Sequence, residues 1–78
     1  MEIILLSQRG CTECEHSKKQ LKQLQFEYDF TLQEKDASLA EKYDVYRFPT
    51  MVFMDNSIEI DRLTGLKPLS MIKRILTR

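Results

Sequence analysis

The chain has 78 residues, of which 42% are hydrophobic and 31% are charged. This length supports one small domain, residues 1–78, with a modest core and little room for a large substrate pocket. Twelve Lys and Arg residues balance twelve Asp and Glu residues. No basic surface for nucleic acid is therefore expected, and no stretch approaches the roughly 20 apolar residues of a membrane span.

The N-terminal segment is apolar but short. Residues 3–6 are fewer than the roughly 7–15 residues of a signal peptide's apolar core, and they follow Glu2 instead of basic residues. We therefore expect a cytoplasmic protein without a membrane partner. The continuous β-prone run Glu2–Ser7 is typical of a strand buried on both faces, which predicts a central position in a sheet.

A turn at residues 8–10 and a helix at residues 12–25 are expected next. The composition of this segment is strongly helical, with Cys14, Leu21 and Leu24 on one stripe that should face the core. Residues 26–32 then alternate between apolar and polar side chains, which predicts a second, half-buried strand. The two strands should be parallel, because a helix connects them.

The second half of the chain predicts a short helix, a hairpin and a last helix. Asp36 can cap a short helix that runs through Tyr43. Residues 50–54 and 57–63 are expected to be strands joined by a turn at Asp55 and Asn56, and Gly65 should end the sheet. Pro68 suits the first turn of the last helix, whose apolar stripe is Leu69, Ile72, Ile75 and Leu76.

Both cysteines of the chain, Cys11 and Cys14, lie two residues apart directly after Gly10. On the first turn of a helix they face the same side and can form a disulfide. Cys11 should lie beside the unpaired N–H groups of the helix end, which favour a thiolate, so we predict that it is the nucleophile. Cys14, one turn deeper, should attack a mixed disulfide on Cys11 as the resolving thiol. In a reducing compartment such a disulfide is usually transient and catalytic.

A pair of cysteines at this spacing can also be half of a zinc site. Such a site needs two further Cys or His ligands, and the chain offers only His16, which is too close to Cys14 for the usual ligand spacings. No metal is therefore expected within one chain. A non-enzymatic module that holds a metal or an iron–sulfur cluster between two chains stays open as an alternative.

With these elements in place, the chain resembles the thioredoxin superfamily along nearly its whole length, at the size of a glutaredoxin. Residues 36–50, which end in Phe48, Pro49 and Thr50, look like the thioredoxin segment that ends in a cis-proline followed by threonine. The resemblance implies a minimal α/β thioredoxin fold, a four-stranded mixed sheet with flanking helices in the order β-α-β-α-β-β-α. It also implies that Pro49 is cis and faces the cysteine pair, and that the backbone of Phe48 pairs with a substrate strand.

The chain departs from the thioredoxin pattern at three points. Thioredoxins carry Trp before the first cysteine and Gly-Pro between the two, whereas this chain has Gly10 and the dipeptide Thr12-Glu13. They also carry a buried Asp on the preceding strand, and residues 3–7 contain no acid. A thioredoxin-style buried base is therefore absent from the expected site.

Two other subfamilies are matched only in part. Glutaredoxins usually have Pro-Tyr between the cysteines, Thr-Val before the cis-proline and a Gly-Gly-x-Asp anchor for glutathione. Of their features only the basic residue upstream of the pair, Arg9, has a counterpart here. Small redoxins that serve ribonucleotide reductase carry Trp-Ser-Gly-Phe-Arg-Pro, and residues 63–68 resemble this signature apart from the Trp.

The leading hypothesis is a monomeric thiol-disulfide oxidoreductase that reduces protein disulfides and acts as a cytoplasmic electron donor. It would bind no cofactor beyond its own redox-active disulfide and be re-reduced by thioredoxin reductase with NADPH or by glutathione. Expected clients are disulfide-containing proteins, with ribonucleotide reductase as one candidate. The alternative enzyme is a glutathione-dependent glutaredoxin. Beside the catalytic Cys11 and Cys14, the predicted substrate-binding residues are Arg9, Thr12, Glu13, Phe48, Pro49, Thr50 and Gly65.

Overall fold

Four strands and two helices make up most of the computed structural model, which describes residues 1–78. In chain order the elements are β1 (Glu2–Ser7), α1 (Thr12–Leu24), β2 (Thr31–Asp36), η1 (Ala37–Leu39), η2 (Glu41–Tyr43), β3 (Thr50–Asp55), β4 (Ile58–Thr64) and α2 (Leu69–Leu76). The elements η1 and η2 are single 3₁₀ turns. Neither α1 nor α2 combines the length and the apolar character that a membrane crossing needs.

The sheet is mixed and has the strand order β2-β1-β3-β4. β1 is parallel to β2, as the sequence predicts, and their carboxyl ends meet where Ser7 pairs with Asp36. β3 is antiparallel to both β1 and β4. The prediction of a minimal four-stranded thioredoxin fold is confirmed, and β1 occupies the expected internal position.

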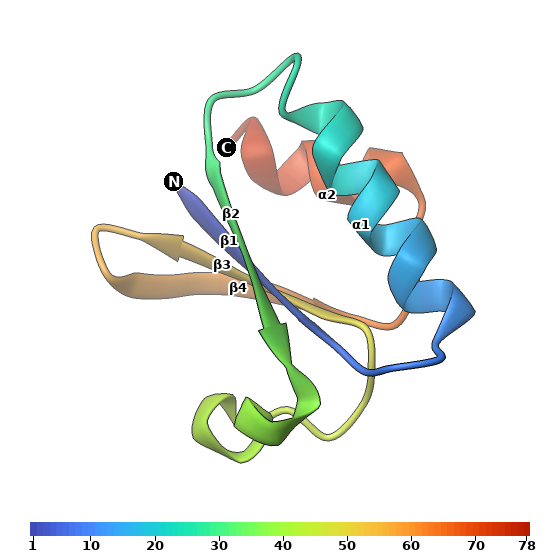
Figure 1. Ribbon diagram of the computed structural model, residues 1–78. Helices are drawn as coiled ribbons and strands as arrows, with labels where there is room; N and C mark the ends of the chain where they lie inside the picture. Colours follow the sequence, from blue (N-terminus) through green and yellow to red (C-terminus); the bar gives the residue numbers. More distant parts are fainter.

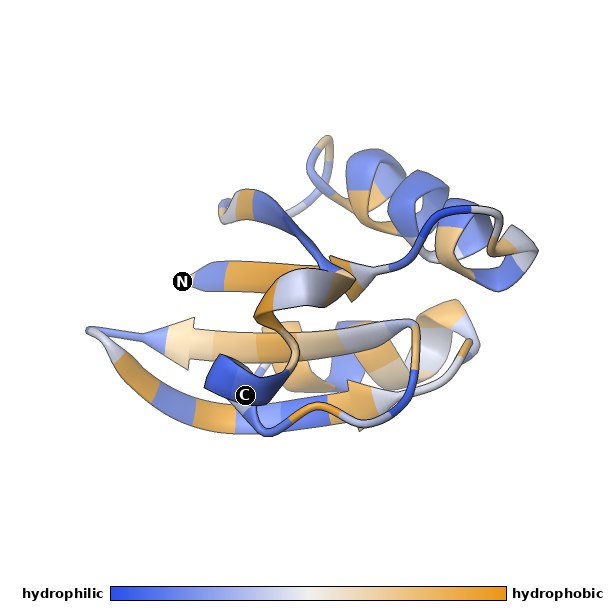
Figure 2. Ribbon diagram, turned by 60° about the horizontal axis from the view of Figure 1, so that its bottom comes forward, coloured by the Kyte–Doolittle hydropathy of each residue, from blue (hydrophilic) through white to orange (hydrophobic).

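Helices α1 and α2 lie on one face of the sheet, and the two 3₁₀ turns lie on the other (Figure 1). The face covered by the helices holds the larger core of ten buried side chains, namely Ile3, Leu5, Leu21, Leu24, Phe30, Met51, Phe53, Leu63, Ile72 and Ile75. The opposite face holds a smaller core of four, namely Ile4, Leu6, Val45 and Val52. β1 supplies both cores, so most of it is apolar in Figure 2, whereas β4 shows alternating bands.

The second strand begins later than predicted. β2 starts at Thr31, although the apolar alternation begins at Phe26. α1 ends at Leu24, and carbonyl groups of its last turn accept hydrogen bonds from the N–H groups of residues 25–28. This hydrogen bonding turns the chain and leaves Phe26 93% exposed. The bonds that close the helix end therefore override the alternating pattern, and Phe30 is the first of these side chains to be buried.

The predicted short helix after β2 is wrong in kind, because the segment forms two 3₁₀ turns. Asp36 does cap the first turn, since its carboxylate accepts a hydrogen bond from the Ser38 N–H at 3.1 Å. Hydrogen bonding from Ser38 lowers the pKa of Asp36 below its ordinary value. Asp44, with a left-handed backbone at φ 55°, then ends the second turn, because a right-handed helix cannot continue through that conformation.

The hairpin turn lies one residue later than predicted. Asn56 and Ser57 form it, and both have positive φ, 51° and 65°. Two central residues with positive φ match the right-handed twist of the flanking strands. β3 and β4 consequently pair from the turn to their far ends, where Thr50 lies opposite Thr64.

Candidate active site

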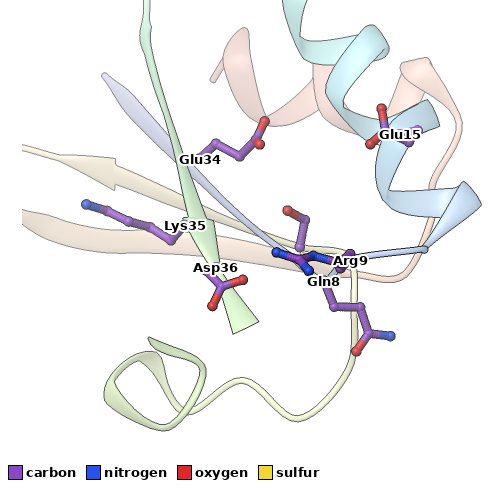
Figure 3. A pocket seen from close by; sticks show the side chains of 7 residues that line it. Gln8, Arg9, Glu15, Glu34, Lys35 and Asp36 are labelled. Carbon is purple, nitrogen blue, oxygen red and sulfur yellow. The ribbon is translucent and has the colours of Figure 1, made fainter. Parts of the chain in front are cut away.

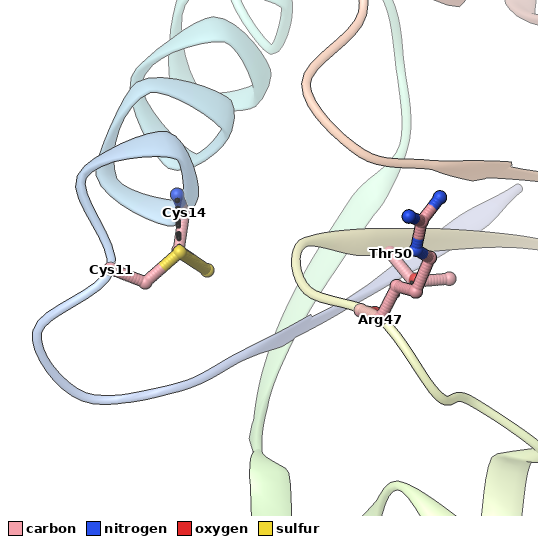
Figure 4. Close-up of a disulfide and its surroundings, with 4 residues drawn as sticks. All are labelled: Cys11, Cys14, Arg47 and Thr50. Atoms are coloured by element: carbon pink, nitrogen blue, oxygen red, sulfur yellow. Dashed lines mark hydrogen bonds between the residues drawn. A yellow bond between two sulfur atoms is a disulfide. The ribbon is translucent and has the colours of Figure 1, made fainter.

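Cys11 and Cys14 are joined by a disulfide at the N-terminus of α1, with 5.2 Å between their Cα atoms. Gly10 precedes them with φ +73°, a left-handed conformation that glycine adopts at little cost. The chain thereby turns sharply from β1 into the helix. Cys11 is the N-cap, and its sulfur accepts a hydrogen bond from the Cys14 N–H at 3.1 Å (Figure 4).

The two cysteines differ in exposure. Cys11 is half-buried at the mouth of the helix, whereas Cys14 is only 2% exposed. After reduction, the free N–H groups and the positive end of the helix dipole stabilise a thiolate at Cys11. The burial of Cys14 disfavours a charged sulfur there.

At the same end of the sheet as the cysteine pair, a turn between Arg47 and Thr50 (Figure 4) contains Phe48 and Pro49. The peptide bond between these residues is cis, as the resemblance implies. Thr50 is buried, and its hydroxyl donates to the Arg47 carbonyl at 2.7 Å, which closes the turn (Figure 4). The Gly65 N–H donates to the Pro49 carbonyl at 2.7 Å and so joins the end of β4 to the turn.

The residues of this turn leave a surface open to a partner. Phe48 is half-buried and packs against the smaller core, yet neither of its backbone polar groups has a hydrogen-bond partner within the chain. Tyr46 is 81% exposed, and Arg47 is exposed next to it. An unpaired backbone edge with an aromatic and a basic side chain therefore lies at the same end of the sheet as the disulfide, since Leu6 near the end of β1 pairs with Thr50 at the start of β3.

The remaining predicted residues lie around the helix mouth. Thr12 and Glu13 are exposed on the first turn of α1. Arg9 lines a polar pocket of about 350 Å³ at the carboxyl ends of β1 and β2, where it points toward Asp36 (Figure 3). This pocket is lined by Ser7, Gln8, Arg9, Glu15, Glu34, Lys35 and Asp36. Arg9 thus lies on the β2 side of β1, while the proline turn leads into β3 on the other side.

Sequence reasoning missed Arg62, which fastens the segment leading to the proline turn. Its guanidinium donates to the Tyr43 carbonyl at 3.0 Å and to the Asp44 carbonyl at 3.1 Å. Two further hydrogen bonds, of 2.7 and 2.8 Å, go to the Glu59 carboxylate. These bonds raise the pKa of Arg62 and lower the pKa of Glu59. No signal in the sequence marks Arg62, because its carbonyl partners have no side-chain signature.

Ser17 and Gln20 were also missed. Ser17 is fully buried on α1, and Gln20 donates from its side-chain amide to the Lys67 carbonyl at 2.8 Å. The helical spacing from Cys14 could have found them, since both follow it at three-residue steps on one face. As for metal, no three side chains of His, Cys, Asp or Glu converge within the chain.

Solved thioredoxin structures share this fold. Thioredoxin 1 of Thermosipho africanus matches with a TM-score of 0.81 and 20% identity, over 99% of this chain and 96% of that one. Schistosoma mansoni thioredoxin matches with a TM-score of 0.84 and 18% identity, over 97% of this chain and 75% of that one. Fasciola hepatica thioredoxin matches with a TM-score of 0.80 and 23% identity, over 99% of this chain and 78% of that one. At such identities the likeness shows the fold alone, and no curated protein matches the chain.

The family model described as Glutaredoxin-like domain (DUF836) matches residues 2–73. The match covers every strand, both cysteines, the proline turn and most of α2. The disulfide between Cys11 and Cys14 lies at the start of the first helix. The chain therefore belongs to the Glutaredoxin-like domain (DUF836) family and is a thioredoxin-superfamily redoxin, a thiol redox protein with its CxxC pair at residues 11–14.

Proposed function

We propose that this redoxin reduces disulfide bonds of client proteins and acts as a cytoplasmic electron donor. The observation that carries the proposal is the difference between the two sulfurs. Cys11 caps the helix and is half-exposed, while Cys14 is 2% exposed behind it. Only Cys11 combines access for a client with donors that stabilise a thiolate.

The reaction has two thiol-disulfide exchange steps. The Cys11 thiolate attacks one sulfur of the client disulfide, so that a Cys11–client bond forms and the other client sulfur leaves as a thiolate. The Cys14 thiolate then attacks the Cys11 sulfur, which forms the Cys11–Cys14 disulfide and expels the second client thiolate. The client gains two electrons from the dithiol. The protons that Cys11 and Cys14 lose are balanced, through solvent, by those that the client thiolates take up.

The turn at Phe48 and Pro49 is the proposed docking edge for the client. Phe48 has unpaired backbone groups, which support pairing with an extended client strand, as in recognition by added β-strands. Gly65 holds the Pro49 carbonyl, and Thr50 closes the turn from behind. Thr12 and Glu13, exposed at the helix mouth, would contact the client beside its disulfide.

The reductant is proposed to be either a thioredoxin reductase with NADPH or glutathione. Each supplies the two electrons that return the Cys11–Cys14 disulfide to the dithiol. Clients would be disulfide-containing proteins, and ribonucleotide reductase is included because residues 63–68 resemble the signature of its donors. We propose that the chain acts as a monomeric single domain.

Insulin reduction tests the proposal and separates the reductants. The protein is supplied with insulin and either thioredoxin reductase with NADPH, or glutathione with glutathione reductase and NADPH, and NADPH consumption is followed. We expect insulin-dependent NADPH consumption with one of the two systems and none with Cys11→Ser. No acceleration by the wild-type protein in either system would overturn the proposal.

A second candidate, a glutathione-dependent glutaredoxin, is favoured by the family model that the chain matches. In that case glutathione would reduce the Cys11–Cys14 disulfide directly and small glutathione mixed disulfides would be substrates. The same assay distinguishes the two functions. Activity that requires glutathione, and that is retained on a small glutathione mixed disulfide in Cys14→Ser, would favour the glutaredoxin.

A further inference from the structure

Two buried polar atoms on α1 have no hydrogen-bond partner within the protein. They are the hydroxyl oxygen of Ser17 and the side-chain carbonyl oxygen of Gln20. The amide nitrogen of Gln20 is fixed by its 2.8 Å hydrogen bond to the Lys67 carbonyl. Buried polar groups in native proteins are nearly always paired. Two unpaired oxygen atoms on neighbouring turns of one helix therefore point to hydrogen-bond partners that they gain when the protein is reduced.

Both residues continue the line of the resolving cysteine. Ser17 follows Cys14 by three residues and Gln20 follows Ser17 by three, and residues at this spacing are neighbours on a helix surface. Cys14 and Ser17 are both buried, at 2% and 0% exposure. The other buried positions of α1, Leu21 and Leu24, are apolar. Cys14, Ser17 and Gln20 therefore form a row of side chains with polar atoms along the otherwise apolar face.

The resolving cysteine needs such a partner. A buried thiolate in apolar surroundings is disfavoured, yet Cys14 must become a nucleophile for the second exchange step. β1 offers no buried carboxylate, because its buried residues, 3–6, are all apolar and its one acidic residue, Glu2, lies at the end of the strand away from the cysteine pair. Thr50 is the only other buried side chain with a polar group, and its hydroxyl already donates to the Arg47 carbonyl.

We propose that the Ser17 hydroxyl is the hydrogen-bond partner of reduced Cys14 and that Gln20 is the positioning residue that orients it. In the thiol form the Cys14 S–H donates to the Ser17 oxygen, and the Ser17 O–H donates to the Gln20 side-chain oxygen. When Cys14 gives its proton to solvent, the Ser17 O–H turns and donates to the thiolate. The inference rests on the proposed function, since it concerns the second step of that reaction.

Charged side chains around α1 do not offer an alternative partner, because none of them is buried. Lys18, on the turn after Cys14, is paired with Glu34 of β2 at 3.3 Å. The other charged or titratable side chains of α1 are Glu13, Glu15, His16, Lys19 and Lys22, all exposed. On the elements around this helix they include Arg47 before the proline turn, Lys67 in the loop after β4, and Lys73 and Arg74 on α2. Their effect on the Cys14 sulfur is common to all the variants below, so a change in pH dependence reports on Ser17.

Stopped-flow reaction with the aromatic disulfide 5,5′-dithiobis(2-nitrobenzoate) measures the two steps separately. The Cys11 thiolate attacks the reagent, forms a mixed disulfide and releases one coloured thiolate, at a rate proportional to reagent concentration. Cys14 then attacks the Cys11 sulfur and expels the second coloured thiolate, at a rate independent of that concentration. The proton of the Cys14 thiol goes to solvent. The second phase therefore reports the resolving step alone.

Ser17→Ala should slow the second phase at neutral pH by about tenfold or more, because a hydrogen bond to a charged group corresponds to a ten- to hundredfold change. The pH midpoint of that phase should rise by about one unit, while the first phase stays unchanged. Ser17→Thr, which keeps the hydroxyl, should retain the wild-type midpoint. Gln20→Met should raise the pH midpoint of the second phase, as Ser17→Ala does, but by less.

Ser70→Ala is the matched control, since Ser70 is exposed on α2 and should leave both phases unchanged. A wild-type second phase and midpoint in Ser17→Ala would overturn the inference while leaving the proposed function intact. Failure of the proposed function would look different, as the wild-type protein would then show no concentration-independent phase. Should Ser17→Ala misfold, an unshifted pH midpoint in Gln20→Met would count against the proposed hydrogen bonds between Cys14, Ser17 and Gln20 in the same way.

Discussion

The two faces of the sheet support the two halves of the site unequally. The face covered by α1 and α2 buries ten side chains and carries the cysteine pair on α1. The opposite face buries four and carries the segment that leads to the proline turn. On this second face the chain forms only two 3₁₀ turns, and Arg62 fastens them to β4.

This difference assigns separate tasks to the two cores. The larger core fixes α1, and with it the relative positions of Cys11 and Cys14. The smaller core and Arg62 fix the segment that leads to Phe48, the proposed docking edge. Damage to the first face should therefore cost global stability, whereas damage to the second should cost recognition of protein clients more than reactivity of the thiols.

Leu5 and Leu6 provide the sharpest test, because they are neighbours on β1, are both 0% exposed and point to opposite cores. Leu5→Ala should lower the free energy of unfolding by about 3–5 kcal/mol, since the large, tightly packed core cannot collapse around the cavity. Denaturant unfolding measures this loss. A loss below that of Leu6→Ala would contradict the ranking of the two cores.

Leu6→Ala should lower the free energy of unfolding less, by about 2–3 kcal/mol, because the turns that cover the smaller core can relax into the space. The same variant should slow insulin reduction more than it slows the reaction with the small aromatic disulfide. Leu5→Ala serves as its control. Equal slowing on the protein substrate and the small reagent would show that Leu6 does not support the docking edge.

Arg62→Met should loosen the backbone at Tyr43 and Asp44, because the carbonyl groups of these two residues lose their hydrogen-bond donor. We expect a loss of about 1–2 kcal/mol in unfolding free energy and slower insulin reduction with unchanged first-phase reactivity of Cys11. Arg74→Met, an exposed change on α2, is the control. If Arg62→Met behaved like that control on insulin, the guanidinium would have no part in holding the docking segment.

The smallest effect concerns acid stability. Hydrogen bonding to Arg62 lowers the pKa of Glu59 below its ordinary value of about 4.5, so folding favours the ionised carboxylate. The stabilisation is therefore present above the unfolded pKa and is lost as pH falls through the lower folded pKa. Glu59→Gln should remove this part of the pH dependence, less than about 1 kcal/mol because the pair is partly exposed. Unfolding measured from neutral pH to below pH 4.5 checks it, and an unchanged slope would contradict the assignment.

Local chemistry made much of the fold predictable. The central strand follows from the apolar run at residues 3–6, α1 from its composition and the cysteine positions from its first turn. The second strand was misplaced because the apolar alternation from Phe26 continued across a helix end whose carbonyl groups are satisfied by residues 25–28. Short apolar alternation does not reveal such backbone bonds.

The candidate site was predictable only where its residues carry chemical signatures. The cysteine pair and the proline turn carry such signatures, and the sequence identified both. Arg62 was not identified, since it acts on the carbonyl groups of Tyr43 and Asp44, which any residue possesses. Ser17 looked like an ordinary helix residue until its complete burial without a partner became visible.

Trapping of the mixed disulfide tests most directly that Cys11 attacks and Cys14 resolves. Cys14→Ser and Cys11→Ser are each incubated, reduced, with insulin, and covalent adducts are quantified by mass spectrometry without reducing agent. The account predicts a stable adduct through Cys11 in Cys14→Ser and little or none in Cys11→Ser, because the remaining Cys14 is 2% exposed. An adduct that forms readily through Cys14, with none through Cys11, would contradict it.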